Sequence, residues 1–81
     1  MAIHAVIERV RPAIGQGEGV LLIWADQGLG LKAEDFDLTR LGPIDIIENN
    51  PRIPGRADIW LNGTCPLRKG EQLLLNRRPQ P

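Results

Sequence analysis

Few side chains in this sequence could carry out a reaction, and they are scattered along the chain. His4 is the only histidine and Cys65 the only thiol. A cysteine nucleophile needs a base such as His4 beside it, but Pro66 follows Cys65 and favours a turn position instead. The sequence has no serine and no tyrosine, which excludes serine-triad and tyrosine-based mechanisms. We therefore expect no enzyme activity and no catalytic residues.

Metal and cofactor sites are also not expected. The carboxylates of Glu34, Asp35 and Asp37 lack the spacing of a calcium loop, and a solvated helix start explains them better. A closed zinc site within one chain would need more ligands than His4 and Cys65 supply. The glycines of residues 15–19 precede an apolar run, whereas a dinucleotide-binding fingerprint follows a strand and opens a helix.

A basic group in the last third of the chain leaves a nucleic-acid-binding module as one alternative. A platform for nucleic acid normally interleaves exposed aromatic side chains with basic ones. Trp24 and Trp60 instead lie inside apolar strand patterns, so we expect both in the core and favour a solvated or protein-binding basic face. The basic residues are Arg52, Arg56, Arg68, Lys69, Arg77 and Arg78.

Short apolar runs separated by turn residues predict β-strands at residues 20–25, 44–47, 57–61 and 72–75, with a returning strand beginning at residues 29–31. Residues 3–10 suit a strand and a short helix equally, and Pro12 ends either. Asn62-Gly63 predicts a two-residue turn of mirror-image type. Residues 33–41 predict a short helix that ends at Gly42-Pro43 and buries Phe36, Leu38 and Leu41.

These elements predict a mainly β fold with one short helix, as a small β-barrel or half-barrel completed by oligomerisation. We expect one domain over residues 1–76, with an N-terminal arm at 1–14 and a polar frayed tail at 77–81. A chain of 81 residues has a small core, which makes help from a partner chain expected.

Short strands in a small chain leave unpaired backbone groups at the sheet margins. Residues 21–25 and 72–75 carry little charge and are the candidate assembly surfaces. Residues 1–50 carry eight acidic and four basic side chains, and residues 51–81 carry two and six, so acidic residues of one copy could meet basic residues of the next. The candidate interface residues are Leu21, Leu22, Ile23, Trp24, Ile59, Trp60, Leu73, Leu74 and Leu75. The candidate charged contacts are Glu34, Asp35, Asp37, Arg68, Lys69, Arg77 and Arg78.

The N-terminal residues lack the charged-then-apolar order of a secretion signal, and no apolar stretch approaches the ~20 residues that cross a bilayer. We expect a cytoplasmic or virion-associated protein with no membrane insertion. Its partners would be further copies of itself and other protein subunits.

Residues 20–75 resemble the SpoA (surface presentation of antigens) domain of flagellar switch and type III secretion sorting-platform proteins. The similar elements are an apolar strand at residues 20–24, a helix with a Leu-x-x-x-Asp-Phe-like pattern, Leu-Gly-Pro-Ile-Asp-Ile-Ile at 41–47, Ala-Asp-Ile-Trp-Leu-Asn-Gly at 57–63 and Lys-Gly-Glu-Gln-Leu-Leu at 69–74. The resemblance implies an intertwined β-rich dimer that serves as a structural brick of a ring or platform, without catalysis.

Residues 46–53 and 67–75 are also similar to the end of a LysM-like phage tail module, where an Ala-Asn-Pro helix end precedes a Pro-x-Gly-x-x-Leu-x-Leu-Pro motif. This second resemblance implies a small structural protein of a virion, in a phage tail or capsid.

Overall fold

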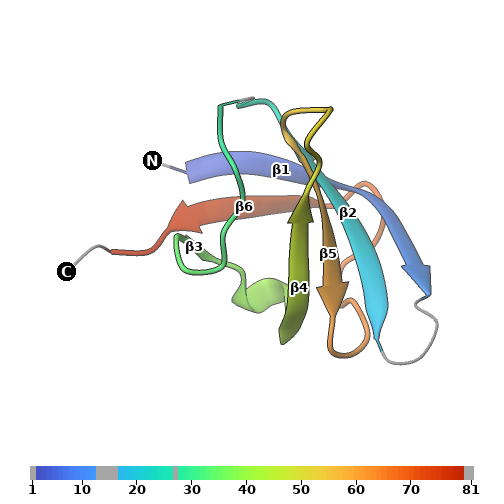
Figure 1. The fold of residues 1–81 in the computed structure, drawn as a ribbon. Helices are drawn as coiled ribbons and strands as arrows, with labels where there is room; N and C mark the ends of the chain where they lie inside the picture. Colours follow the sequence, from blue (N-terminus) through green and yellow to red (C-terminus); the bar gives the residue numbers. More distant parts are fainter. Residues whose placement is uncertain (1, 13–16, 27, 80–81) are drawn as a thin grey trace.

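Six β-strands form one antiparallel sheet that curls into a half-barrel (Figure 1). The computed structural model describes residues 2–12, 17–26 and 28–79. The order across the sheet is β3-β6-β1-β2-β5-β4. The elements are β1 Ala2–Pro12, β2 Glu18–Trp24, β3 Phe36–Asp37, the 3-10 helix η1 Thr39–Leu41, β4 Ile44–Asn49, β5 Arg56–Leu61 and β6 Gln72–Arg77. The prediction of a mainly β fold with one short helix is confirmed.

The concave face of the sheet holds the core. Strand residues alternate between the two faces, so every second side chain of the central strands points inward. In β5, for example, Ala57, Ile59 and Leu61 are buried while the residues between them are only half-buried. The other buried strand residues are Ala5, Ile7, Val20, Leu22, Trp24, Phe36, Leu73 and Leu75.

Residues 28–43, which include β3 and η1, fill the open side of the half-barrel between β4 and β6. Leu31, Phe36, Leu38 and Leu41 from this segment are all at most 3% exposed and join the core cluster. The predicted burial of Phe36, Leu38 and Leu41 is therefore confirmed. Because the segment supplies four core side chains, it closes the core that the sheet alone would leave open.

Hydrogen bonds attach this segment to both margins of the sheet. At the β4 margin, the side-chain amide of Asn49 accepts from the Leu31 N–H (2.8 Å) and donates to the Leu31 carbonyl (3.0 Å). At the β6 margin, the Arg78 N–H donates to the Asp35 carbonyl (2.7 Å), and Arg78 Nε donates to the carbonyls of Ala33 and Phe36 (3.0 Å each). The segment is thus held although only two of its residues form a strand.

The first strand does not behave as an arm. β1 lies between β6 and β2 and pairs with both of them, so residues 2–12 are an integral part of the sheet, and Pro12 ends the strand as expected. The remaining residues of the predicted arm, and residues 80–81 of the predicted tail, lie outside the described residues. Arg77 belongs to β6 and Arg78 is hydrogen-bonded, so these two residues are not a frayed tail.

Two other local predictions are wrong. The helix expected at residues 33–41 is reduced to the three residues of η1, because Phe36 and Asp37 pair with β6 instead. Residues 29–31 form no strand, and it is the side chain of Asn49 that satisfies the Leu31 backbone.

The helical segment Thr39–Leu41 is far too short to span a membrane, and no other helix occurs in residues 2–12, 17–26 and 28–79.

Asn62-Gly63 does not form the predicted two-residue turn. That turn needs positive φ at both residues, but only Gly63 has one (150°). The strands on either side, β5 and β6, are not neighbours in the sheet. The Asn62 N–H donates to the Pro43 carbonyl and the Gly63 carbonyl accepts from the Glu18 N–H, both at 2.9 Å. Contacts with distant segments therefore determine this loop.

Candidate functional site

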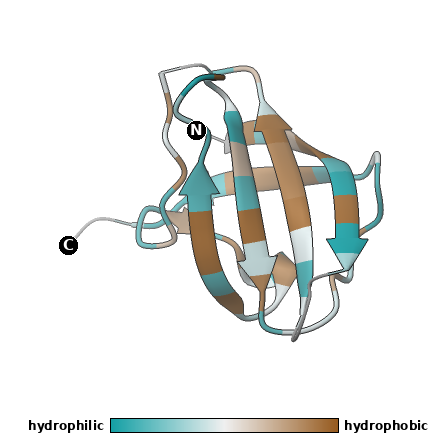
Figure 2. Ribbon diagram, turned by 45° about the vertical axis from the view of Figure 1, so that its right-hand side comes forward, coloured by the Kyte–Doolittle hydropathy of each residue, from teal (hydrophilic) through white to brown (hydrophobic). Residues whose placement is uncertain are grey.

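The convex face of the sheet carries the most distinctive group of side chains. We call the outward-pointing residues of β1, β2, β5 and β4 the outer face. Strand pairing places Val6 beside Ile23 and Ile23 beside Arg56 in one row. In Figure 2, β4, β5 and β2 lie side by side, with β5 alternating between teal and brown and β2 brown along most of its length. The apolar composition of β2 thus extends to its outward positions, Leu21 and Ile23, which are half-buried.

A cluster around Trp60 occupies one end of the outer face. Gly19 lies opposite Trp60, and a methyl group at Gly19 would come within 2.6 Å of Cζ3 of the indole. The indole ring therefore packs against the bare backbone of β2 at Gly19, where a side chain would collide with it. The Arg11 guanidinium covers it, with Cζ 5.2 Å from the ring centroid, a contact worth about 0.5–1 kcal/mol at exposed sites.

Two carboxylates fix the polar ends of this cluster. Trp60 Nε1 donates to Glu48 Oε1 (3.0 Å), and Arg11 Nη2 donates to Asp58 Oδ1 (2.9 Å). Ile46, the partner of Trp60 in β4, is 50% exposed. Arg11 Nε is buried and has no acceptor among the described residues. We call Arg11, Gly19, Glu48, Asp58 and Trp60 the Trp60 cluster.

The rest of the outer face combines an apolar row with a second charge pair. We call Val6, Leu21 and Ile23 the apolar row. These side chains are half-buried on β1 and β2, where no other layer of the described chain covers them. Arg56 Nη2 lies 3.7 Å from Glu8 Oε1 beside this row. The pairing of long charged side chains around an apolar centre leaves a surface suited to contact with another protein.

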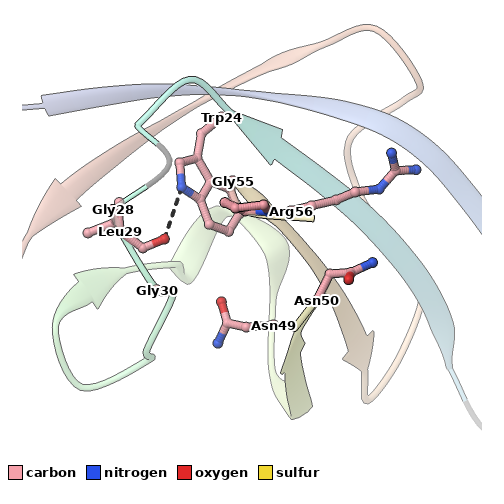
Figure 3. A pocket seen from close by; sticks show the side chains of 9 residues that line it. Trp24, Gly28, Leu29, Gly30, Asn49, Asn50, Gly55 and Arg56 are labelled. Atoms are coloured by element: carbon pink, nitrogen blue, oxygen red, sulfur yellow. Dashed lines mark hydrogen bonds between the residues drawn. The ribbon is translucent and has the colours of Figure 1, made fainter. Parts of the chain in front are cut away.

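Two clefts lie near the ends of β4. The first, of about 210 Å³, is lined by Trp24, residues 28–30, Asn49, Asn50 and residues 54–56 (Figure 3). Part of its polar lining is already engaged, since Trp24 Nε1 donates to the Leu29 carbonyl (3.2 Å) and both amide atoms of Asn49 bind Leu31. The second, of about 250 Å³, lies at the Ile44 end between Leu38, Thr39 and Arg78.

His4 and Cys65 are not brought together. His4 is exposed near the start of β1, opposite Leu74 of β6. Cys65 is buried near the other end of β2, where its N–H donates to Glu18 Oε1 (2.7 Å) and its thiol donates to the Leu67 carbonyl (3.2 Å). His4 is therefore not positioned to act as a base for this thiol.

The acidic segment at residues 34–37 is engaged locally. Asp37 accepts hydrogen bonds from the Thr39 hydroxyl (2.7 Å) and the Thr39 N–H (3.0 Å). The side-chain bond from Thr39 is the largest cause that lowers the pKa of Asp37, followed by the Thr39 backbone bond and the nearby charge of Arg78. Within residues 2–12, 17–26 and 28–79, no group of three His, Cys, Asp or Glu side chains could hold a metal ion. Of the glycines at 15–19, Gly15 lies outside the described residues and Gly19 makes room for Trp60.

The candidate assembly residues divide between the core and the surface. Leu22, Trp24, Ile59, Leu73 and Leu75 are buried in this chain's own core and cannot contact a partner directly. Leu21, Ile23 and Trp60 are half-buried on the outer face, and Leu74 is 38% exposed. The expectation of a free edge at residues 21–25 is wrong because β2 pairs with β1 and β5 on its two sides.

Trp60 is the clearest misplacement by the sequence pattern. The apolar pattern predicts it in the core with Trp24, but of the two only Trp24 is buried there, at 7% exposure. The alternation in β5 contains the missing signal, since Asp58 and Trp60 are two residues apart and must point to the same face. The sequence gives no signal for Arg11, Ile46 and Glu48, because strand pairing, rather than sequence proximity, brings them to Trp60.

The candidate charged contacts do not form one patch. Arg68 and Lys69 precede β6, whereas Arg77 and Arg78 lie at its other end. A six-residue strand spans about 20 Å, which separates the two pairs. Arg77 lies over the Phe36 ring (5.0 Å to the centroid), and Arg78 is bonded to residues 33–36, beside the acidic residues Glu34, Asp35 and Asp37 of the same chain.

No protein-family model, curated protein or solved structure matches this chain.

Proposed function

We propose that this protein is a non-enzymatic assembly subunit, and that it associates with a second copy of itself through the outer face. The observation that carries the proposal is the row of half-buried apolar side chains at outward positions, Val6, Leu21 and Ile23, next to the half-buried Trp60. Outward positions of a single-layer sheet that face water are normally polar. An apolar row there gains free energy, about 25 cal/mol for each Å² covered, when another surface covers it.

The charges around the row favour a second copy as the partner. Three acidic side chains, Glu8, Glu48 and Asp58, and three basic ones, Arg9, Arg11 and Arg56, surround the apolar centre. A partner surface that carries predominantly one sign of charge would repel the three side chains of that same sign. A two-fold contact of the face with itself can place acidic against basic residues in both directions, because each patch carries both signs.

The Trp60 cluster supports the same face as an interface. Tryptophan and arginine are the residue types most enriched among those that dominate binding energy. Here both are held in place before any partner binds, by Gly19 beneath the ring and by the carboxylates of Glu48 and Asp58. Side chains that are already ordered lose less conformational entropy on association.

The larger assembly is part of the proposal. A ring or platform of the kind formed by SpoA domains is the first candidate, and a virion, in a phage tail or capsid, is the second. Arg68 and Lys69 are separated from Arg77 and Arg78 by the length of β6, so they form no continuous basic track of the kind that a nucleic-acid-binding module would use.

The test is the native mass of the chain and of an Ile23→Glu variant, measured by light scattering after gel filtration. Ile23 lies beside Arg56, so an introduced glutamate has an opposite charge next to it and the fold should be retained. We expect a dimer or larger species for the unchanged chain and a monomer for Ile23→Glu. The matched control is Ile53→Glu, since Ile53 is 50% exposed in the loop between β4 and β5 and should keep its association.

Two results would refute the proposal. One is a folded, unchanged chain that remains monomeric at concentrations up to about 1 mM, the weak end of specific association. The other is an Ile23→Glu variant that associates as strongly as the Ile53→Glu control. Unfolding temperatures of both variants show whether a loss of association reflects a loss of fold.

A further inference from the structure

β4 is a margin strand whose second side has no strand partner among the described residues. The Asn50 N–H donates to the Arg56 carbonyl (2.9 Å), which identifies this pair as hydrogen-bonded. Hydrogen-bonded pairs recur every second residue in an antiparallel ladder, so Glu48 and Ile46 also face β5. The N–H and C=O groups of Ile47 and Asn49 therefore point away from the sheet.

We propose that the free side of β4 accepts an extended segment of a partner protein as an added strand. An added strand gains affinity from main-chain hydrogen bonds and specificity from sites for its alternate side chains. β4 offers both, since clefts of about 210 and 250 Å³ lie near its Asn49 and Ile44 ends. Between those ends, Ile46 is 50% exposed and Asp45 and Glu48 are exposed.

The charge of β4 determines which segment fits. Ile44–Asn49 contains two acidic residues, Asp45 and Glu48, and no basic residue. Pairing of β4 with β4 of a second copy would bring four carboxylates to one seam, which is unfavourable. The register shift between Ile44 and Ile46 adds one residue to β4 and interrupts the alternation at Asp45, so Asp45 and Glu48 can lie on the same side of the strand. A segment in which lysine or arginine alternates with apolar residues then places positive charge beside both carboxylates.

The chain's own β6 does not meet this requirement. One side of β6 pairs with β1, and on the other side β3 pairs only with Asn76 and Arg77. Residues 72–75 are therefore unpaired on that second side, and they contain no charged side chain. The added strand is therefore assigned to a different protein. The free side of β4 lies outside the apolar row of the outer face and shares Glu48 with the charges around that row; it does not need a second copy, so the inference does not rest on self-association.

The probe is a blocked peptide, Lys-Val-Lys-Val-Lys-Val-Lys, carrying a fluorophore, and the control probe is Glu-Val-Glu-Val-Glu-Val-Glu. We expect the lysine peptide to raise fluorescence anisotropy on binding and the glutamate peptide to bind at least tenfold more weakly. Binding should slow hydrogen exchange of the Ile47 and Asn49 amides, which point outward, without slowing that of Asp58 on β5. Equal binding of the two peptides, or unchanged exchange at Ile47, would overturn the proposal.

Matched variants locate the contact. Asp45→Asn removes one exposed carboxylate from β4, and Glu71→Gln removes one before β6 while preserving the acceptor for the Arg68 N–H. We expect Asp45→Asn to weaken lysine-peptide binding about two- to fivefold, the effect of one exposed charge pair, and Glu71→Gln to leave it unchanged. Equal effects of the two variants would show attraction to net charge alone and would refute strand addition at β4.

The same experiment distinguishes strand addition at β4 from self-association through the outer face. The Ile23→Glu variant keeps β4 intact, so it should bind the lysine peptide as the unchanged chain does. If the chain is dimeric but does not bind the peptide, only the strand-addition proposal fails. If it is monomeric and binds the peptide at β4, only the proposed self-association fails.

Discussion

Asn49 offers the sharpest test of how the open side of the half-barrel is closed. Its amide makes two hydrogen bonds with one residue: Oδ1 accepts from the Leu31 N–H and Nδ2 donates to the Leu31 carbonyl. The substitution Asn49→Asp preserves the size of the side chain and the acceptor but removes the donor. It also places a carboxylate oxygen against the Leu31 carbonyl oxygen.

The expected loss of stability follows from the burial of Leu31, which is 1% exposed. A buried carbonyl that loses its donor costs about 1–3 kcal/mol, and the exposure of Asn49 places the effect near the middle of that range. We expect Asn49→Asp to lower the free energy of unfolding by about 2 kcal/mol at pH 7. In a domain of this size that loss lowers the melting temperature by about 8–16 °C.

Asn50→Asp is the matched control on the adjacent residue. Asn50 Oδ1 accepts from the N–H groups of Arg52 (2.9 Å) and Ile53 (3.0 Å), and its amide nitrogen has no partner among the described residues. A carboxylate can keep both bonds, so the same substitution should change stability by less than about 0.5 kcal/mol. Urea unfolding followed by tryptophan fluorescence measures both variants.

Lowering the pH adds an independent check on the cause. The contact with the Leu31 carbonyl favours the protonated form of the introduced carboxyl, so its pKa is raised in the folded state. The destabilisation is therefore full at neutral pH and decreases as the pH falls through that raised pKa, because the protonated carboxyl can donate to the carbonyl. Equal losses for the variants of Asn49 and Asn50 would refute the reasoning, as would a loss that does not decrease in acid.

Two further predictions concern the outer face and the η1 turn. Gly19→Ala places a methyl group 2.6 Å from the Trp60 ring, so we expect a loss of stability of about 1–2 kcal/mol and a shift in tryptophan emission. An unchanged spectrum would contradict the close contact between Gly19 and the indole. The lowered pKa of Asp37 stabilises the fold at neutral pH, and this contribution is lost as the pH falls through the folded pKa. Thr39→Val removes the hydroxyl group whose hydrogen bond is the largest cause of this lowered pKa. Carboxyl-carbon NMR titration should then show the pKa of Asp37 rising toward its ordinary value. If it does not rise, the Thr39 hydroxyl is not the cause.

The sequence predicts the strands better than their arrangement. Apolar runs bounded by turn residues correctly indicate β2, β4, β5 and β6, since burial on one face requires those residue types. The position of β1 beside β6 could not be predicted, because the two strands are separated by most of the chain. Asn62-Gly63 fails as a turn signal for a related reason: its backbone bonds to Pro43 and Glu18 outweigh the local preference.

The surface site shows the same division. In β5 the polar and apolar residues alternate, so the outward direction of Trp60 could be read from Asp58 two residues before it. In β2 nearly every residue is apolar, and the pattern cannot show that Leu21 and Ile23 point outward while Leu22 points inward. Only the strand pairing resolves that question.

The pairing of the first strand with the last also affects how the protein is made. On the ribosome, β1 and β2 can form a hairpin early, but the other side of β1 stays open until β6 emerges, with Ala2 opposite Asn76 and Val6 opposite Gln72. Such distant pairing slows folding, because the ends of a long loop must meet before the contact contributes. The nascent chain therefore exposes one side of β1 until β6 has emerged from the ribosome, and only then can the sheet be completed.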